Sequence, residues 1–140
     1  MSVIKKSVLI PIDFSELSYQ AIATAKEYVE DIAYLNLIHV LTPLHPADPA
    51  AMWNTLNDDE RKHKVSDFLQ TKLEEMGYSG AKISVAIGDP STEIVDYAAE
   101  IGADLIIMPS HGRKGVSRFL LGSVAERVVR LSPCPVLILK

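Results

Sequence analysis

Short, uninterrupted apolar runs alternate with segments of helical periodicity along this chain of 140 residues. The runs cover residues 7–12, 34–41, 82–87, 104–108 and 136–139. They are apolar at consecutive positions rather than at every second position, which is typical of strands buried on both faces. Five such strands separated by helices predict an α/β fold, a single doubly wound five-stranded parallel sheet with helices on both faces.

Helices are expected between these runs, because apolar residues recur there at intervals of three and four. The first carries apolar residues from Leu17 to Ile32 and has Ser15 available as an N-cap. The second opens at 57–60 and ends at Gly77, with an apolar face of Val65, Phe68, Leu69, Leu73 and Met76. The third follows the turn 88–90, and the last covers 123–131. Residues 42–55 contain three prolines and are the longest predicted loop.

Composition fits one domain over 1–140 and excludes several classes of function. The 14 basic and 18 acidic residues give a net charge of −4, and no long basic run marks a nucleic-acid partner. No stretch approaches the ~20 apolar residues of a membrane span, so membrane insertion is not expected. Cys134 is the single cysteine and allows no internal disulfide. We expect a cytoplasmic protein.

Ligands of doubly wound folds lie beyond the carboxyl ends of the strands, so the polar residues there are the candidates for a site. Residues 108–126 leave a predicted strand and enter a helix at Gly122-Ser123, where free amides and the helix dipole favour an anion. The spacing from Ser123 to Glu126 is that of a capping box. The alternative is that these residues only cap the helix and that nearby Arg113, Lys114 and Arg118 are solvated.

Known nucleotide motifs narrow the possibilities. The chain contains neither Gly-x-x-x-x-Gly-Lys-[Ser/Thr] nor Gly-x-Gly-x-x-Gly, which excludes P-loop hydrolases and dinucleotide-binding proteins of the usual type.

Three segments together resemble the universal stress protein family over essentially the whole chain. Gly112, nine residues and Gly122-Ser123 match the end of that family's nucleotide motif, Gly-x-x-Gly, nine residues, Gly-[Ser/Thr]. The segment Pro11-Ile12-Asp13-Phe14-Ser15 is similar to its first strand and turn, and PCPVLILK to its last strand. The resemblance implies a Rossmann-like domain of the adenine nucleotide alpha hydrolase type. It also implies binding of ATP, ADP or AMP, with Mg²⁺ held by the phosphates, and roles in stress survival and signalling.

The resemblance also implies which residues line the nucleotide site. Asp13 would lie at its mouth beside Pro11 and Ile12. The Val40 backbone would meet the adenine, and Met108 would wall the base. Gly112 and Arg113 would line the ribose and phosphates, with His111 a weaker candidate. The amides around Gly122, Ser123 and Val124 would take the phosphates, assisted by the Ser123 hydroxyl.

One residue departs from the family pattern. The first motif glycine falls on Pro109, which has no N–H and a fixed φ near −65°. A glycine that serves only as a turn could be replaced by proline, whereas a lost amide contact would cost about 1 kcal/mol, or several-fold in affinity. We expect nucleotide binding that is retained and weakened.

The leading functional hypothesis is a regulatory domain that binds an adenine nucleotide, and the alternative is a stress protein that binds no nucleotide and acts through protein contacts. In both, we expect a homodimer through the edge strand 136–139 and a protein partner that the sequence does not identify. No nucleophile and base pair emerges, so an enzyme is the weaker hypothesis, with at most slow ATP hydrolysis. A receiver domain is a further alternative, but it would need a cluster of acidic residues from two strand ends and a lysine after the last strand, and only Asp13 and Lys140 are available. A flavodoxin is another, and flavin absorbance of the purified protein would test it.

The remaining candidate residues have ordinary structural interpretations. His39 lies in an apolar run and is expected to be a hydrogen-bonded structural histidine, while His45 and His63 are expected to be solvated. Cys134 is expected to be a small buried residue. Trp53, in the long loop, is either a lid or partner contact or packs onto the domain.

Overall fold

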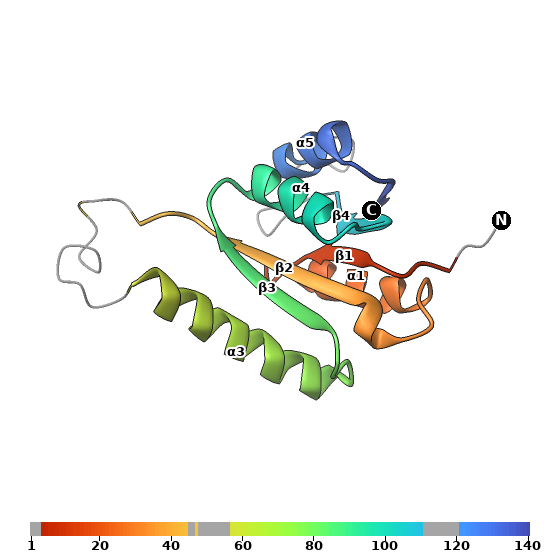
Figure 1. Ribbon diagram of the computed structural model, residues 1–140, viewed down its shortest axis with the longest axis horizontal. Helices are drawn as coiled ribbons and strands as arrows, with labels where there is room; N and C mark the ends of the chain where they lie inside the picture. Colours follow the sequence, from red (N-terminus) through yellow and green to blue (C-terminus); the bar gives the residue numbers. More distant parts are fainter. Residues whose placement is uncertain (1–3, 45–46, 48–56, 111–120) are drawn as a thin grey trace.

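The computed structural model describes residues 4–44, 47, 57–110 and 121–140. They form one parallel sheet in the order β3-β2-β1-β4-β5. Its strands are β1 (Val8–Pro11), β2 (Leu35–Leu41), β3 (Lys82–Ile87), β4 (Leu105–Pro109) and β5 (Val136–Leu139). The helices are α1 (Glu16–Lys26), the 3-10 turn η1 (Ile32–Tyr34), α3 (Asp58–Met76), α4 (Pro90–Glu100) and α5 (Ser123–Leu131). The predicted α/β sheet with helices on both faces is confirmed (Figure 1).

The core is divided into two layers by the sheet. Strand residues Val8, Ile10 and Leu37 are buried with the side chains of α1 and α3. Their neighbours along the strands, Leu9 and Ile38, are buried on the other face with α4 and α5. Consecutive strand residues therefore enter opposite layers, which explains why the strands read as unbroken apolar runs.

The first helix is shorter than its periodicity predicts. Ser15 is its N-cap, as expected, with its hydroxyl accepting the Ser18 amide at 3.1 Å. The helix ends at Lys26 rather than near Ile32. Beyond it, the Tyr28 carbonyl accepts the Lys5 amide at 2.6 Å, and Val29 bridges to Lys5. Pairing with the chain segment before β1 thus ends the helix although the apolar spacing continues.

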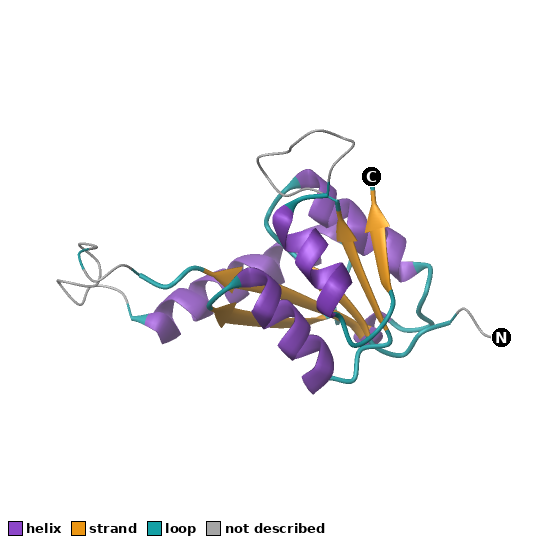
Figure 2. Ribbon diagram, turned by 90° about the horizontal axis from the view of Figure 1, so that it is seen from above, coloured by secondary structure: helices purple, strands orange, loops and turns teal. Residues whose placement is uncertain are grey.

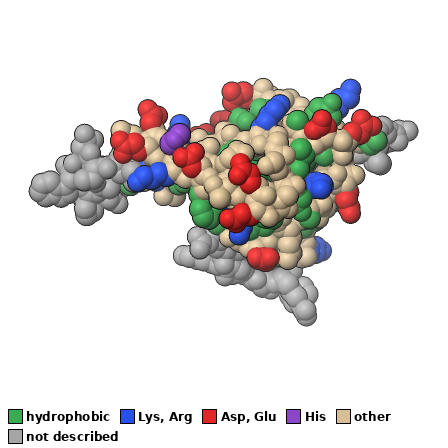
Figure 3. Space-filling model, turned by 90° about the horizontal axis from the view of Figure 1, so that it is seen from below, with side chains coloured by type: hydrophobic (Ala, Val, Ile, Leu, Met, Phe, Trp, Pro, Cys, Tyr) green, Lys and Arg blue, Asp and Glu red, His purple; other side chains and the backbone are tan. Residues whose placement is uncertain are grey.

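The apolar face expected of α3 is only partly buried. Leu69 and Leu73 are fully buried, but Phe68 is 55% exposed, so its assignment to that face was wrong. Leu69 and Leu73 lie four residues apart and point into the sheet, whereas Phe68 is displaced by about a quarter of a turn from them. Figure 3 shows that hydrophobic side chains reach the surface among charged ones on the face viewed from below.

Among the described helices, none is both long enough and apolar enough to cross a membrane. Cys134 is half-buried, and its amide donates to the Ser132 hydroxyl at 3.1 Å. His63 is exposed and lies 3.3 Å from Asp67. His45 and Trp53 lie outside the described residues.

Replacement of Leu69 by alanine tests the layer between α3 and the sheet. Because Leu69 is fully buried, Leu69→Ala should lower the free energy of unfolding by about 2–5 kcal/mol, measured by urea denaturation. The neighbouring exposed residue Gln70 provides the control, because Gln70→Ala should change the free energy of unfolding by less than about 0.5 kcal/mol. Equal losses in both variants would contradict this packing.

Candidate functional site

The sheet opens between β1 and β4 at its carboxyl end. β1 pairs with β4 only at Val8↔Leu105 and Leu9↔Ile106. Beyond that point β1 continues along β2 as far as Pro11, and β4 continues along β5 as far as Pro109. Figure 2 shows β5, which leads to the C-terminus, diverging from the strands on the other side of the opening. The ladder therefore opens at the point where the strand order reverses, the usual ligand position in this architecture, and we call this opening the crevice.

Two prolines face each other across this opening. The amide of Ile106 donates to the Pro135 carbonyl at 3.0 Å, and that of Ser110 to the Leu139 carbonyl at 2.8 Å. Even-numbered residues of β4 thus direct their backbone groups to β5, and because the direction alternates along a strand, the backbone of Pro109 faces β1. The Ile12 amide donates to β2 at 2.8 Å, so by the same alternation position 11 turns toward β4. The next two rungs of a β1–β4 ladder would need N–H groups from Pro11 and Pro109, which have none. With proline at these two positions, neither rung can form.

Pro109 lies inside β4, one residue beyond the strand that the sequence predicts. It is accommodated because its missing N–H faces the crevice rather than the β4–β5 ladder. The same orientation means that any ligand in the crevice lacks one backbone donor there.

Asp13 lies just after β1, in a turn that fixes its carboxylate. Its Oδ1 accepts the Ser15 amide at 3.0 Å and also the Ser15 hydroxyl. Phe14, between them, has φ of +66°, a left-handed conformation that non-glycine residues seldom adopt. Such strain costs about 1–3 kcal/mol and persists only where surrounding contacts impose it.

The contacts that hold this turn come from β2 and α3. The Phe14 ring lies 4.4 Å from the His39 ring and 5.5 Å from the Phe68 ring, centroid to centroid. His39 Nδ1 lies 2.5 Å from the Ile12 carbonyl oxygen, which confirms the prediction of a hydrogen-bonded structural histidine. Phe68, which is too exposed to be a core residue, thus contributes to this turn.

The field of Asp13 extends to α1. Burial, and then the negative charges of Asp13 and Glu16, raise the pKa of the Tyr19 phenol. The Asp13 carboxylate thus places a negative charge at the β1 side of the crevice.

The N-terminus of α5 lies at the other side of the crevice. The Gly122 amide donates to the Ser110 carbonyl at 2.7 Å, which returns the chain to the end of β4. Gly122 is the N-cap and makes no side-chain cap, so the capping box expected from Ser123 to Glu126 is wrong. The first helical bond runs from Glu126 to Gly122, and the amides of Ser123 and Val124 lie before it. An N-cap glycine leaves this end open to a ligand.

Val40 and Met108 belong to the α4–α5 side of the sheet. Val40, near the end of β2, packs against the cluster that includes Met108, which is 5% exposed. Both side chains therefore lie in the core layer between the sheet and these two helices, and their predicted contacts with the base stay predictions. His111, Gly112 and Arg113 lie outside the described residues, and their predicted roles remain predictions.

An ion pair that we did not predict joins α4 to α5. Arg127 Nη1 lies 3.5 Å from Asp89 Oδ2. The Thr92 amide and the Ser91 and Thr92 hydroxyls, followed by Arg127, lower the pKa of Asp89. The sequence signal was the Gly-Asp-Pro turn at residues 88–90, which predicts the start of a helix but does not show that Asp89 pairs with Arg127 of another helix. Among the described residues, no group of three histidine, cysteine or acidic residues is placed to hold a metal.

Comparison with known proteins gives the family. The family model described as "Universal stress protein family" matches residues 5–140. Universal stress protein MJ0531 of Methanocaldococcus jannaschii is 34% identical, over 96% of this chain and 82% of its own length. Universal stress protein MJ0577 of the same organism is 32% identical, over 100% of this chain and 98% of its own.

Solved structures agree in fold. The structure of MJ0577 matches with a TM-score of 0.72 at 32% identity, covering 99% of this chain and 97% of that one. A universal stress protein in complex with cAMP matches with a TM-score of 0.64 at 23% identity, covering 97% of each chain. The Archaeoglobus fulgidus protein in complex with dAMP gives 0.61 at 18%, covering 98% of this chain and 99% of that one. Because the family model matches residues 5–140 and these relatives align with 96% and 100% of its length, the chain belongs to the universal stress protein family.

Proposed function

We propose that this protein binds an adenine nucleotide in the crevice between β1 and β4 and acts as a regulatory domain in the stress response. The observation that carries the proposal is the opening itself, with the α5 N-terminus held at its edge by the bond between Gly122 and Ser110. Two related structures carry adenine nucleotides, cAMP in one and dAMP in the other. The chemistry of the two sides of the crevice fits such a ligand.

The phosphates are assigned to the α5 side. The amides of Ser123 and Val124 precede the first helical bond, and the dipole of α5 adds positive potential at the same place. Gly122 has no side chain to block approach, and the exposed Ser123 hydroxyl is a further donor. When Mg²⁺ is present, we assign it to the phosphate oxygens of the bound nucleotide.

The nucleoside is assigned to the β1 side. Ser15 occupies Oδ1 of Asp13, and Oδ2 is the atom we assign to the ribose hydroxyls. The base would lie against the backbone of Val40 and beside Met108. The donor missing at Pro109 faces this ligand, so we expect weaker binding than a residue with an amide would give.

The alternative is a family member that binds no nucleotide and acts only through protein contacts, with Pro109 as the reason. Nucleotide released from the denatured protein and identified by mass spectrometry, followed by calorimetric titration with ATP and Mg²⁺, separates the two. A dissociation constant beyond the millimolar range for ATP, ADP and AMP would reject the proposal. We expect at most slow hydrolysis of bound ATP. We also propose that the protein acts in the cytoplasm.

Asp13→Asn tests the assignment of the ribose. Asparagine keeps an oxygen for Ser15 but loses the charge, so ATP affinity should fall by about tenfold. Wild-type protein should bind 2′,3′-dideoxy-ATP about tenfold more weakly than ATP, and this difference should nearly vanish in the variant. Calorimetry measures all four values, and a variant that still discriminates between the two nucleotides would refute the contact.

Pro109→Ala tests the missing donor. Alanine restores an N–H that faces the crevice, so nucleotide affinity should increase several-fold, equivalent to about 1 kcal/mol. Pro109→Gly restores the same N–H and adds backbone freedom, so the two variants separate the donor from flexibility. Unchanged affinity in both would show that no ligand atom meets this amide.

A homodimer through β5 is the assembly that we propose. Pro135 and Leu139 direct their carbonyls to β4, so Val136 and Ile138 direct their amides and carbonyls to the free edge. All four β5 residues are half-buried and apolar, and an exposed apolar edge favours pairing with another strand.

Light scattering at micromolar concentration should therefore give twice the chain mass of 15.4 kDa. Ile138→Pro removes an outward amide but no bond to β4, and it should shift the mass toward the monomer. Unchanged far-UV circular dichroism would serve as the control for folding. A wild-type monomer at this concentration would contradict the assembly.

A further inference from the structure

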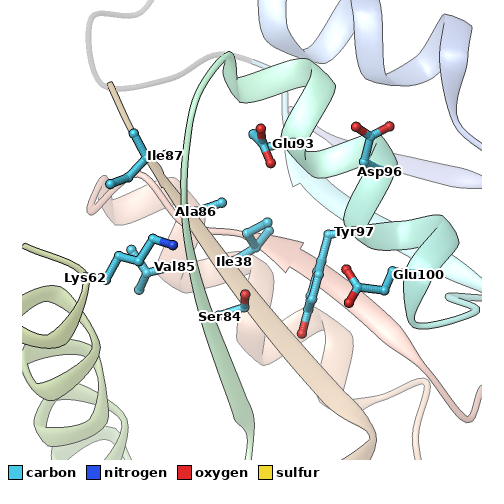
Figure 4. Close-up of a pocket in the computed structure, with 10 residues that line it drawn as sticks. All are labelled: Ile38, Lys62, Ser84, Val85, Ala86, Ile87, Glu93, Asp96, Tyr97 and Glu100. Carbon is cyan, nitrogen blue, oxygen red and sulfur yellow. The ribbon is translucent and has the colours of Figure 1, made fainter. Parts of the chain in front are cut away.

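A groove lies along β3 at the opposite edge of the sheet from β5. It has a volume of about 290 Å³ and is lined by β3 residues 84–87, Ile38 of β2, one face of α4 and Lys62 of α3. Figure 4 shows Lys62 approaching β3 from one side while Tyr97 and Glu100 approach from the other. The groove is separate from the β1–β4 crevice, because β2 lies between β3 and β1.

The backbone of β3 presents free hydrogen-bonding groups along this groove. The Gly88 amide donates to Leu41 of β2 at 2.9 Å, so the even-numbered residues of β3 face β2. Ile83, Val85 and Ile87 therefore direct their amides and carbonyls away from the sheet. In the described part of the chain no strand pairs with that side of β3. An edge of this kind accepts an added strand.

The same edge is uncovered on its α4 side. α3 packs against β3 from one layer, whereas Ser84 and Ala86 line the open groove in the other. Both side chains are small, so the groove continues inward to Ile38. A strand added to β3 would place alternate side chains above this floor.

Three carboxylates form the α4 wall of the groove. Glu93, Asp96 and Glu100 lie at intervals of three and four residues, on one helical face, with Tyr97 between them. From Glu93 to Glu100 the face spans about 10 Å, close to the roughly 13 Å covered by three alternate residues of a strand. Lys62 is the one basic residue in the lining. The wall therefore favours alternate basic side chains.

We propose that β3 and this groove bind an extended, basic segment of a partner protein, which pairs with β3 and directs alternate Lys or Arg side chains toward Glu93, Asp96 and Glu100. Ile83, Val85 and Ile87 supply the backbone hydrogen bonds, and the carboxylates supply the selectivity. A second copy of this chain fits less well, because its net charge is −4 and its own β3 carries a single lysine.

The probe for this proposal is the peptide acetyl-Lys-Val-Lys-Val-Lys-Val-amide, titrated into the ¹⁵N-labelled full chain. We expect shift changes in β3 and along α4, and slower hydrogen exchange of the Ile83, Val85 and Ile87 amides. The matched peptide with glutamate in place of each lysine, called the Glu-Val peptide, should not bind. Methylation of the backbone nitrogens on the pairing edge of the probe should abolish binding without changing its charge, because it removes the donors of the added strand.

The acidic wall is tested by a triple variant and a matched control. Glu93→Gln, Asp96→Asn and Glu100→Gln together should weaken binding of the probe by about tenfold, the order expected for three partly exposed ion pairs. Glu30→Gln, Glu74→Gln and Glu75→Gln change the net charge equally at exposed positions outside the groove and should have little effect.

Several results would overturn the proposal. They are shift changes elsewhere on the protein or none at all, equal weakening by the two triple variants, and binding of the Glu-Val peptide. Another is protection of the three β3 amides that rises with protein concentration without the peptide, because that would identify a second copy as the occupant.

Discussion

The candidate site lies where the order of strands in the sheet reverses, and two backbone hydrogen bonds between its facing strands are missing there. Pro11 and Pro109 stand on facing strands, at the positions whose amides would extend the β1–β4 ladder beyond Leu9. Beyond Leu9 the two halves of the sheet are no longer paired, and the helices that follow β1 and β4 pack on opposite faces. No crossover covers the gap, because the strand order reverses there. The position of the site therefore follows from the strand order, and the two prolines leave its facing edges without two N–H donors.

The two sides of the crevice are held by different means. On the β1 side the left-handed Phe14 is stabilised by a tilted ring contact with His39 and an edge contact with Phe68, so Asp13 stays at the strand end. On the β4 side one backbone bond, from Gly122 to Ser110, returns α5 to the sheet. Most groups that would meet a ligand are backbone amides. This explains why composition and side-chain clusters alone do not indicate the site.

Sequence reasoning succeeded where local pattern and tertiary environment agree, and it failed where a distant segment decides. The bounds of β3, α5 and β5 agree with their patterns, although the residues of the two edge strands β3 and β5 are only partly buried. The end of α1 depends on Lys5 pairing beyond the helix, which periodicity does not register. Pro109 reads as a loop residue, yet it ends a strand because its nitrogen faces a gap. Phe68 reads as core, and its partner Phe14 is visible only in three dimensions.

The two edges of the sheet differ in chemistry, and this difference limits how the protein can assemble. β5 offers outward backbone groups flanked by apolar side chains, which suits a copy of itself. β3 offers the same backbone groups beside Glu93, Asp96 and Glu100, so a second acidic chain would be repelled there while a basic strand would be attracted. An α/β sheet with two equivalent apolar edges would polymerise through both. In the two proposals made above, acidic residues on α4 therefore restrict self-association to β5 and leave β3, separated from β5 by three strands, for a different partner.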